Sequence, residues 1–305
     1  MNKIKNIILS CFLLSTINIF CQDRAILNSQ YLFNGLVLNP AYAGRNEVFT
    51  FSFSHRSQWM GFEGAPSSQT ISLHWPMKNV KTALGILLFN ESIGSRNYKN
   101  IYLNYAYRIP IGNGKLSLGL KGGISTGRFD LIDLGNGEYI FDDKLENYLL
   151  PNFGLGAYYF NRHFFAGFSI PLLMGYKDGG ETVGLQVYHD FKKYSYYVTA
   201  GYTFPLTNTL SMQPSFLLHY EISYSFDPDL NLSLNYKDIF MGGLSYRPGE
   251  AFIFLFNYRM NYQARVGVSY DLGLGELSNY HNGSFEITFQ YEFGFKINAT
   301  DPGNF

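Results

Sequence analysis

The chain has 305 residues and a formal net charge of zero, and 15% of its residues are charged, whereas a soluble domain usually has about 25%. Aromatic residues make up 18%, yet no segment beyond residue 21 approaches the roughly 20 consecutive apolar residues of a transmembrane helix. The absence of a basic block argues against nucleic acid as a partner. This composition is typical of an outer-membrane β-barrel, whose apolar residues occupy every second position and contact lipid.

Residues 1–21 have the features of a secretory signal peptide. Lys3 and Lys5 form a positively charged start, and the apolar stretch that follows is too short to span a bilayer comfortably. Both cysteines, Cys11 and Cys21, belong to this segment, so the mature chain is predicted to contain no disulfide and no cysteine-based metal site. We therefore expect Sec-dependent export followed by removal of this segment.

Residues 22–46 precede the first predicted strand and combine apolar side chains with turn residues. We predict that they form a plug, packed inside the barrel or against its periplasmic mouth. The residues expected to build this plug are Gln30, Tyr31, Phe33, Asn34, Asn39, Pro40, Tyr42 and Gly44. For the last four, a rigid turn that fixes the plug to the first strand and a contact with a periplasmic partner are both open alternatives.

Residues 47–296 alternate apolar and polar side chains with the period of two that defines a β-strand. The alternation predicts an all-β fold, a transmembrane antiparallel barrel of about fourteen strands, because the outward face is too aromatic over too many strands for a soluble sandwich. Residues 297–305 are expected to form a short periplasmic tail. The predicted strands are residues 47–57, 67–76, 80–91, 98–109, 114–127, 150–161, 163–172, 194–204, 208–222, 229–236, 239–247, 250–259, 262–271 and 284–296.

The lengths of the predicted connections support an even number of strands. Counted along the chain, the long connections are the fifth, seventh and thirteenth, at residues 128–149, 173–193 and 272–283. Every even-numbered connection is short. Since single-chain barrels have short periplasmic turns and longer outer loops, both chain ends are predicted to face the periplasm. The first outer connection then carries candidate contact residues for an external partner, or residues that fold inward and close the barrel: Arg56, Gln58, Trp59, Gly61, Phe62, Glu63 and Pro66.

Several inward-facing positions carry features that bear on the lumen. Residues 82–89 and 251–258 are apolar on both faces, which predicts a lumen that is partly filled. Five charged residues, Arg56, Arg108, Arg265, Glu286 and Glu292, fall on inward faces. They are expected to form a charge ladder that ties the lumen together, whereas in an open porin the same charges would tune ion selectivity.

Catalytic and metal-binding functions find little support. The six histidines occur singly, and no GxSxG motif is present. An acidic cluster in the predicted fifth connection lacks the ordered ligand spacing of a calcium loop, so a solvated outer loop is favoured over a cation site. We therefore expect no enzymatic activity and no cofactor. The cluster comprises Asp130, Asp133, Asn136, Glu138, Asp142 and Asp143.

Two stretches near the start of the mature chain resemble the N-terminal signature of the PorP/SprF family, outer-membrane proteins of the type IX secretion system and gliding motility. They are NSQYLFNGLVLNPAYAG at residues 28–44 and RSQWMGFEGAP at residues 56–66. Because strand parity places these two stretches at opposite ends of the barrel, we do not expect them to form one continuous site. The C-terminal stretches GLSYR, VGVSYDL and NGSFEI are similar to the end of the family.

The resemblance implies location in the cell outer membrane, in contact with its lipid, and a role in export and surface attachment of specific cargo through protein–protein interaction. The implied partners are the periplasmic ring and peptidoglycan-binding proteins of that system and the C-terminal domain of a secreted cargo or adhesin. A passive outer-membrane channel or hydrophobic-solute transporter is the alternative, because the same strand pattern would serve it equally well.

Overall fold

A computed structural model describes residues 28–294 of the chain, except for 79, 95, 130–131, 134–138, 141–147, 179–184 and 223–224. The predicted signal peptide, the predicted C-terminal tail and most of the acidic cluster therefore lie outside the described residues. Three short 3₁₀ helices are present in the described part: η1 (Pro40–Tyr42), η2 (Phe191–Lys193) and η3 (Glu276–Tyr280). Among the described residues, no helix has the length and apolarity needed to cross a bilayer.

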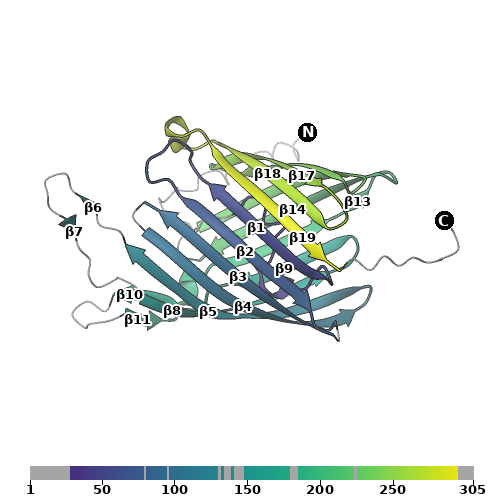
Figure 1. Cartoon of the computed structure of the whole chain (residues 1–305), viewed down its shortest axis with the longest axis horizontal. Coiled ribbons are helices and arrows are strands. Elements are labelled where there is room, and N and C mark those ends of the chain that lie inside the picture. Colours follow the sequence, from purple (N-terminus) through teal and green to yellow (C-terminus); the bar gives the residue numbers. More distant parts are fainter. Residues whose placement is uncertain are drawn as a thin grey trace, which may run out of the picture.

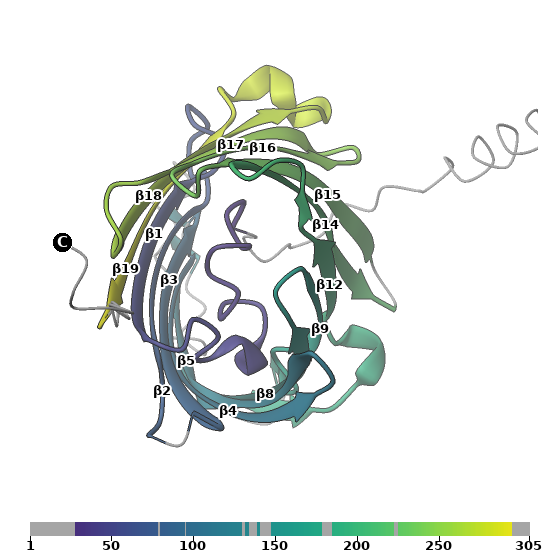
Figure 2. The same cartoon turned by 90° about the vertical axis from the view of Figure 1, so that its right-hand side faces the viewer.

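The strands form a closed antiparallel barrel (Figures 1 and 2). Each strand pairs with its neighbours in sequence, and β1 (Phe49–Ser57) pairs with β19 (Ser284–Phe293) to close the ring. Both β12 and β13 pair with β14, and only Thr203 separates them, so they act as one interrupted strand. The barrel thus has fourteen strands, as the alternation predicted.

The remaining barrel strands are β2 (Ser67–Pro76), β3 (Thr82–Ile93), β4 (Arg96–Ile111), β5 (Gly114–Phe129), β8 (Tyr148–Phe160), β9 (Phe164–Ile170), β12 (Tyr196–Tyr202), β13 (Phe204–Pro205), β14 (Leu210–Glu221), β15 (Ser225–Tyr236), β16 (Phe240–Arg247), β17 (Ala251–Arg259) and β18 (Ala264–Gly273). Two small hairpins extend from the connections: β6 (Ile132–Asp133) with β7 (Tyr139–Ile140), and β10 (Gly175–Asp178) with β11 (Leu185–Tyr188).

The predicted strand boundaries agree with these bounds to within a few residues, and the largest difference is at the start of β15. The prediction began this strand at residue 229, whereas β15 starts at Ser225 and includes Pro228, which cannot donate a backbone hydrogen bond to a neighbouring strand. In the structure Pro228 pairs with Leu218 of β14, but the pairing with β16 begins only at Leu230. The proline therefore lies where one side of β15 has no partner strand, which is the position that a sheet tolerates.

The burial of side chains follows the predicted alternation. On β17 the outward residues Phe252, Phe254 and Phe256 are 46%, 51% and 48% exposed, whereas Ile253 and Leu255 are 1% and 5% exposed. The outward face of β17 is thus a row of aromatic side chains, and its inward face is packed. The prediction that the lumen is partly filled near residues 251–258 agrees with this burial.

The two ends of the barrel differ in their connections. At one end, which we call the turn end, the strands are joined by short turns, including residues 112–113 and 237–239, and β1 begins and β19 ends there. At the other end, the loop end, lie the longer connections 58–66, 171–195 and 274–283. All the long connections are at the same end, as the parity of the predicted strands required.

Candidate functional site

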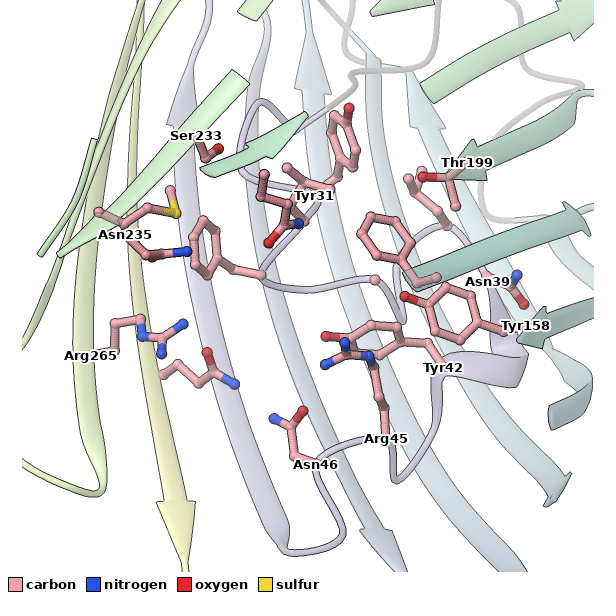
Figure 3. A pocket seen from close by; sticks show the side chains of 18 of the residues that line it. Tyr31, Asn39, Tyr42, Arg45, Asn46, Tyr158, Thr199, Ser233, Asn235 and Arg265 are labelled. Atoms are coloured by element: carbon pink, nitrogen blue, oxygen red, sulfur yellow. The ribbon is translucent and has the colours of Figure 1, made fainter. Parts of the chain in front are cut away.

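Residues 28–46, which we call the lumenal segment, lie inside the barrel (Figure 2). Its apolar side chains are buried: Tyr31 is 3% exposed, Leu36 0% and Ala41 1%. The segment starts near the loop end, beside Arg56, and continues to the turn end, where β1 begins. Figure 3 shows its side chains facing those of the surrounding strands. The contact between this segment and the inner wall is the candidate functional site.

Asn39 fixes the path of the segment and its distance from the wall. Its side-chain oxygen accepts a hydrogen bond from the Ala41 amide at 2.9 Å, which caps η1, and Pro40 occupies the first helical position. Its side-chain nitrogen donates to two wall carbonyls, Ala157 O at 3.0 Å and Phe168 O at 3.2 Å. One asparagine therefore both shapes the turn and anchors it to β8 and β9.

Glycines on the inner wall leave the space that the segment occupies. A Cβ atom at Gly119 of β5 would overlap the backbone of Ala41, and one at Gly156 of β8 would overlap the Asn39 side chain. Gly44, at the end of the segment, has a φ of +69°, which favours glycine, and it packs against Arg108. The segment and the wall are thus matched in shape at the level of the backbone.

Apolar contacts hold the middle of the segment. Leu36 and Tyr42 belong to a buried cluster that also includes wall residues such as Tyr158 and Phe165. The Tyr42 ring contacts the Tyr158 ring edge-on, with centroids 5.6 Å apart. Since burying a leucine or aromatic side chain contributes about 1.5–3 kcal/mol, a few such residues stabilise the docked segment substantially.

A buried polar network anchors the start of the segment. Arg56 Nη2 lies 2.6 Å from Asp271 Oδ2, and its Nη1 lies 3.6 Å from Glu286 Oε2 and donates to Ser29 Oγ at 2.9 Å. The Ser29 amide donates to Glu286 Oε2 at 2.6 Å, and its hydroxyl donates to Asp271. One arginine, two carboxylates and Ser29 therefore form a closed set of charge-assisted contacts.

This network decides between the two alternatives for Arg56 and corrects one prediction. Arg56 takes the inward alternative and is not an outer-loop contact residue, because it lies on β1 with its side chain inside the barrel and is 2% exposed. Its side chain points inward because Arg56 lies on the same face of β1 as Ser54 and Ser52, two and four residues earlier. The two signature stretches also do not lie wholly at opposite ends, since Ser29 of the first contacts Arg56 of the second. The lumenal segment runs further toward the loop end than parity alone suggested.

A second buried network holds Tyr31. Asn231 on β15 donates to the Tyr31 hydroxyl at 2.5 Å and to Asp229 at 2.9 Å, and Arg247 Nε lies 2.6 Å from Asp229 Oδ2. Sequence reasoning missed Asn231, Asp229 and Arg247 as site residues. The strand alternation could have indicated them, because each is a polar or charged residue at an inward-facing position in a chain that has few charged residues.

The other four predicted lumen charges contact the segment or Glu47, the residue just beyond it. Glu286 accepts from Ser29, Glu292 accepts from Asn46 at 3.0 Å, and Arg265 lies over the Phe33 ring at 5.5 Å. Arg108 Nη1 lies 4.0 Å from Glu47 Oε1. Of the predicted charge ladder, the described residues contain one ion pair, between Arg56 and Glu286, and the other predicted charges contact the N-terminal chain instead.

Other predicted plug residues also bond to the wall. Thr288 donates to the Gln30 side-chain oxygen at 2.9 Å, and Ser72 donates to that of Asn34 at the same distance. The Gly44 amide donates to His74 Nδ1 at 3.2 Å. The structure thus brings the predicted N-terminal residues to several different strands instead of to a single cluster.

The lumenal segment separates two cavities. The cavity toward the turn end has a volume of about 410 Å³ and polar lining residues that include Arg45, Asn46 and Arg265 (Figure 3). The cavity toward the loop end has a volume of about 440 Å³ and is lined more by apolar residues. Tyr31 and Leu38 each line both cavities, which lie on opposite sides of the segment.

The connection between β1 and β2 packs on the connection that contains η3. Met60 N donates to Gly283 O at 2.8 Å, and Asn282 N donates to Met60 O at 2.7 Å. Trp59 stacks on His281 with ring centroids 6.1 Å apart, and burial lowers the pKa of the His281 imidazole, which favours its neutral form there. These contacts give the loop a defined shape.

The predicted outer-loop residues differ in exposure. Pro66 is buried and accepts a hydrogen bond from the Gln58 amide at 2.9 Å. Gly61, Phe62 and Glu63 are exposed, and Phe62 is 45% exposed. The loop therefore presents one aromatic and one acidic side chain to its surroundings. Elsewhere in the described residues, no group of three or more histidine, cysteine or acidic side chains could hold a metal ion.

Comparison with known proteins identifies the sequence family and the fold. The family model described as type IX secretion system membrane protein PorP/SprF matches residues 22–291. No curated protein matches the chain. Among solved structures, the TodX deltaS2S3 mutant monoaromatic hydrocarbon channel is similar, with 9% identity, a TM-score of 0.51, and coverage of 85% of this chain and 94% of that chain. Outer membrane protein Omp33 of Acinetobacter baumannii has 9% identity, a TM-score of 0.48, and coverage of 81% and 99%.

Proposed function

Because the chain belongs to the PorP/SprF family of type IX secretion system membrane proteins, we propose that it supports export and surface attachment of specific cargo through protein–protein contacts. It is an outer-membrane β-barrel with a role in type IX secretion. The observation that carries the proposal is the family match, which covers residues 22–291.

In this proposal the lumenal segment is a plug that closes the barrel to solutes. Support comes from its anchoring to opposite parts of the wall: Ser29 bonds to Asp271 and Glu286, and Asn39 bonds to β8 and β9. A barrel closed in this way acts as a rigid platform in the membrane. No enzymatic activity is part of this function.

The proposed topology places the loop end outside the cell and the turn end in the periplasm. The exposed residues Phe62 and Glu63 then form part of the surface that binds the C-terminal domain of a cargo or adhesin. Their loop is held by the Met60 contacts with the connection before β19, so it presents these side chains in a fixed position. The turn end contacts the periplasmic ring and peptidoglycan-binding proteins.

Affinity capture of the full-length protein from outer membranes tests this function. We expect recovery of type IX ring proteins and of a cargo C-terminal domain. The double variant F62A/E63Q should reduce cargo recovery, whereas E276Q/L277A, a matched pair of exposed residues on η3, should not. Deletion of the gene should remove the cargo from the cell surface, and cargo that stays on the surface would contradict the proposal.

A passive channel or transporter for hydrophobic solutes is the second candidate. The observation that favours it is the pair of cavities, about 410 and 440 Å³, on either side of the lumenal segment. Liposome swelling distinguishes the two functions, since a channel admits small solutes at a steady rate and a closed platform does not. Swelling by the wild-type protein would favour the channel.

A further inference from the structure

The cavity toward the loop end has the walls of a ligand-binding pocket. Its volume of about 440 Å³ falls within the roughly 300–1,000 Å³ of small-molecule sites. Leu87, Phe89 and Ile93 of β3 form one side, and Val37 and Leu38 of the lumenal segment form another. Because Tyr31 and Leu38 also line the other cavity, the lumenal segment lies between the two spaces.

One buried cation faces this apolar space. Lys121 of β5 lines the cavity and is 6% exposed, and its Nζ lies 4.2 Å from the centre of the Tyr102 ring. Glu91 also lines the cavity, but no ion pair joins Lys121 to it or to any other carboxylate in the described part of the chain. A buried ammonium without a carboxylate is costly unless another group compensates its charge.

We propose that this cavity binds a small amphiphilic anion, an aliphatic or aromatic carboxylate, with its head at Lys121 and its apolar body between Leu87, Phe89 and Val37. The carboxylate would supply the ion pair that Lys121 lacks, and the Tyr102 ring already holds the ammonium on one side. The apolar body would cover the aliphatic and aromatic lining. This site is independent of cargo binding, because it uses no residue of the exposed loop at Phe62.

Calorimetric titration of the full-length barrel in nanodiscs tests the proposal, with empty nanodiscs subtracted. The probes are decanoate, decanol and decyltrimethylammonium, which share one chain and differ in head group. Decanoate should bind saturably with one site per barrel and at least tenfold more tightly than the other two. This comparison needs no variant, so it holds even where a substitution prevents folding.

Variants locate the site. K121M should weaken decanoate binding at least tenfold and leave decanol unchanged, whereas K192M, at an exposed lysine of η2, should bind decanoate like the wild type. V37W, which fills the cavity from the segment, should abolish binding of decanoate. The proposal is overturned by the absence of saturable binding, by equal binding of decanoate and decanol, or by full decanoate affinity in folded K121M.

Discussion

Replacing Arg56 with methionine should release the start of the lumenal segment from the wall. Arg56 is the cation between Asp271 and Glu286, at 2.6 and 3.6 Å, and it also donates to Ser29 at 2.9 Å. Methionine keeps much of the side-chain volume but removes the charge and all these contacts. Two buried carboxylates would then lie close together without a counterion.

The structure sets the size of this effect. Removing one partner of a buried ion pair costs about 3–5 kcal/mol, and here the lost partner serves two carboxylates that also hold Ser29. Since about 1.4 kcal/mol corresponds to a factor of ten, the equilibrium between docked and released segment should shift by roughly a hundredfold to a few thousandfold. The barrel strands keep their pairing, so the main loss is in docking.

Thiol labelling measures this shift. Both cysteines lie in the predicted signal peptide, so a cysteine placed at Leu36, which is 0% exposed, would be the single thiol of the mature chain. Its reaction with a membrane-impermeant maleimide requires release of the segment, and the rate follows the population of the released state. R56M should accelerate labelling by roughly a hundredfold or more relative to the same cysteine protein with Arg56.

Two controls separate this mechanism from a general effect. R162M removes an exposed arginine at the turn end and should leave the labelling rate unchanged. The triple variant R56M/D271N/E286Q removes the uncompensated charges and should recover much of the docking. A labelling rate for R56M within about threefold of the parent protein would refute the reasoning, because a lost buried ion pair cannot have so small an effect.

Two further substitutions test the fit between the segment and the wall. G119A should destabilise the docked segment by about 1–3 kcal/mol, because its Cβ would overlap the Ala41 backbone, whereas G242A, with open space around it, should change the stability by no more than about 0.5 kcal/mol. Denaturation of the reconstituted barrels in urea compares the two variants, and equal midpoints would contradict the fit. Y31F removes the hydrogen bond from Asn231 and should cost about 1 kcal/mol in the same assay, and an unchanged midpoint would contradict that role.

The fold could be predicted from the sequence because a barrel strand repeats one simple pattern. Each residue faces lipid or lumen by its position alone, so the exposed Phe252 and the buried Ile253 follow from alternation. Strand ends depend on their neighbours, and for this reason the start of β15 at Ser225 was missed. β15 can include Pro228 because its pairing with β16 begins only at Leu230, and the local sequence around Pro228 does not show where that pairing begins.

The candidate site could be predicted only in part. The turn at Asn39 and Pro40 is local, since Asn and Pro determine its backbone conformation, and it is present as η1. The partners of the segment are distant in sequence: Ser29 bonds to Asp271, 242 residues away. Such pairs depend on how the closed barrel surrounds the segment, and no spacing along the chain encodes them.

Single-channel conductance of the purified mature protein in a planar bilayer tests most directly the claim that a docked lumenal segment makes this barrel a closed platform. The wild-type protein should be electrically silent, and R56M should show opening events, because it lacks the arginine that joins Ser29 of the segment to Asp271 and Glu286. R162M should be as silent as the wild type. A steady open pore in the wild-type protein, with the same conductance in R56M, would contradict the claim.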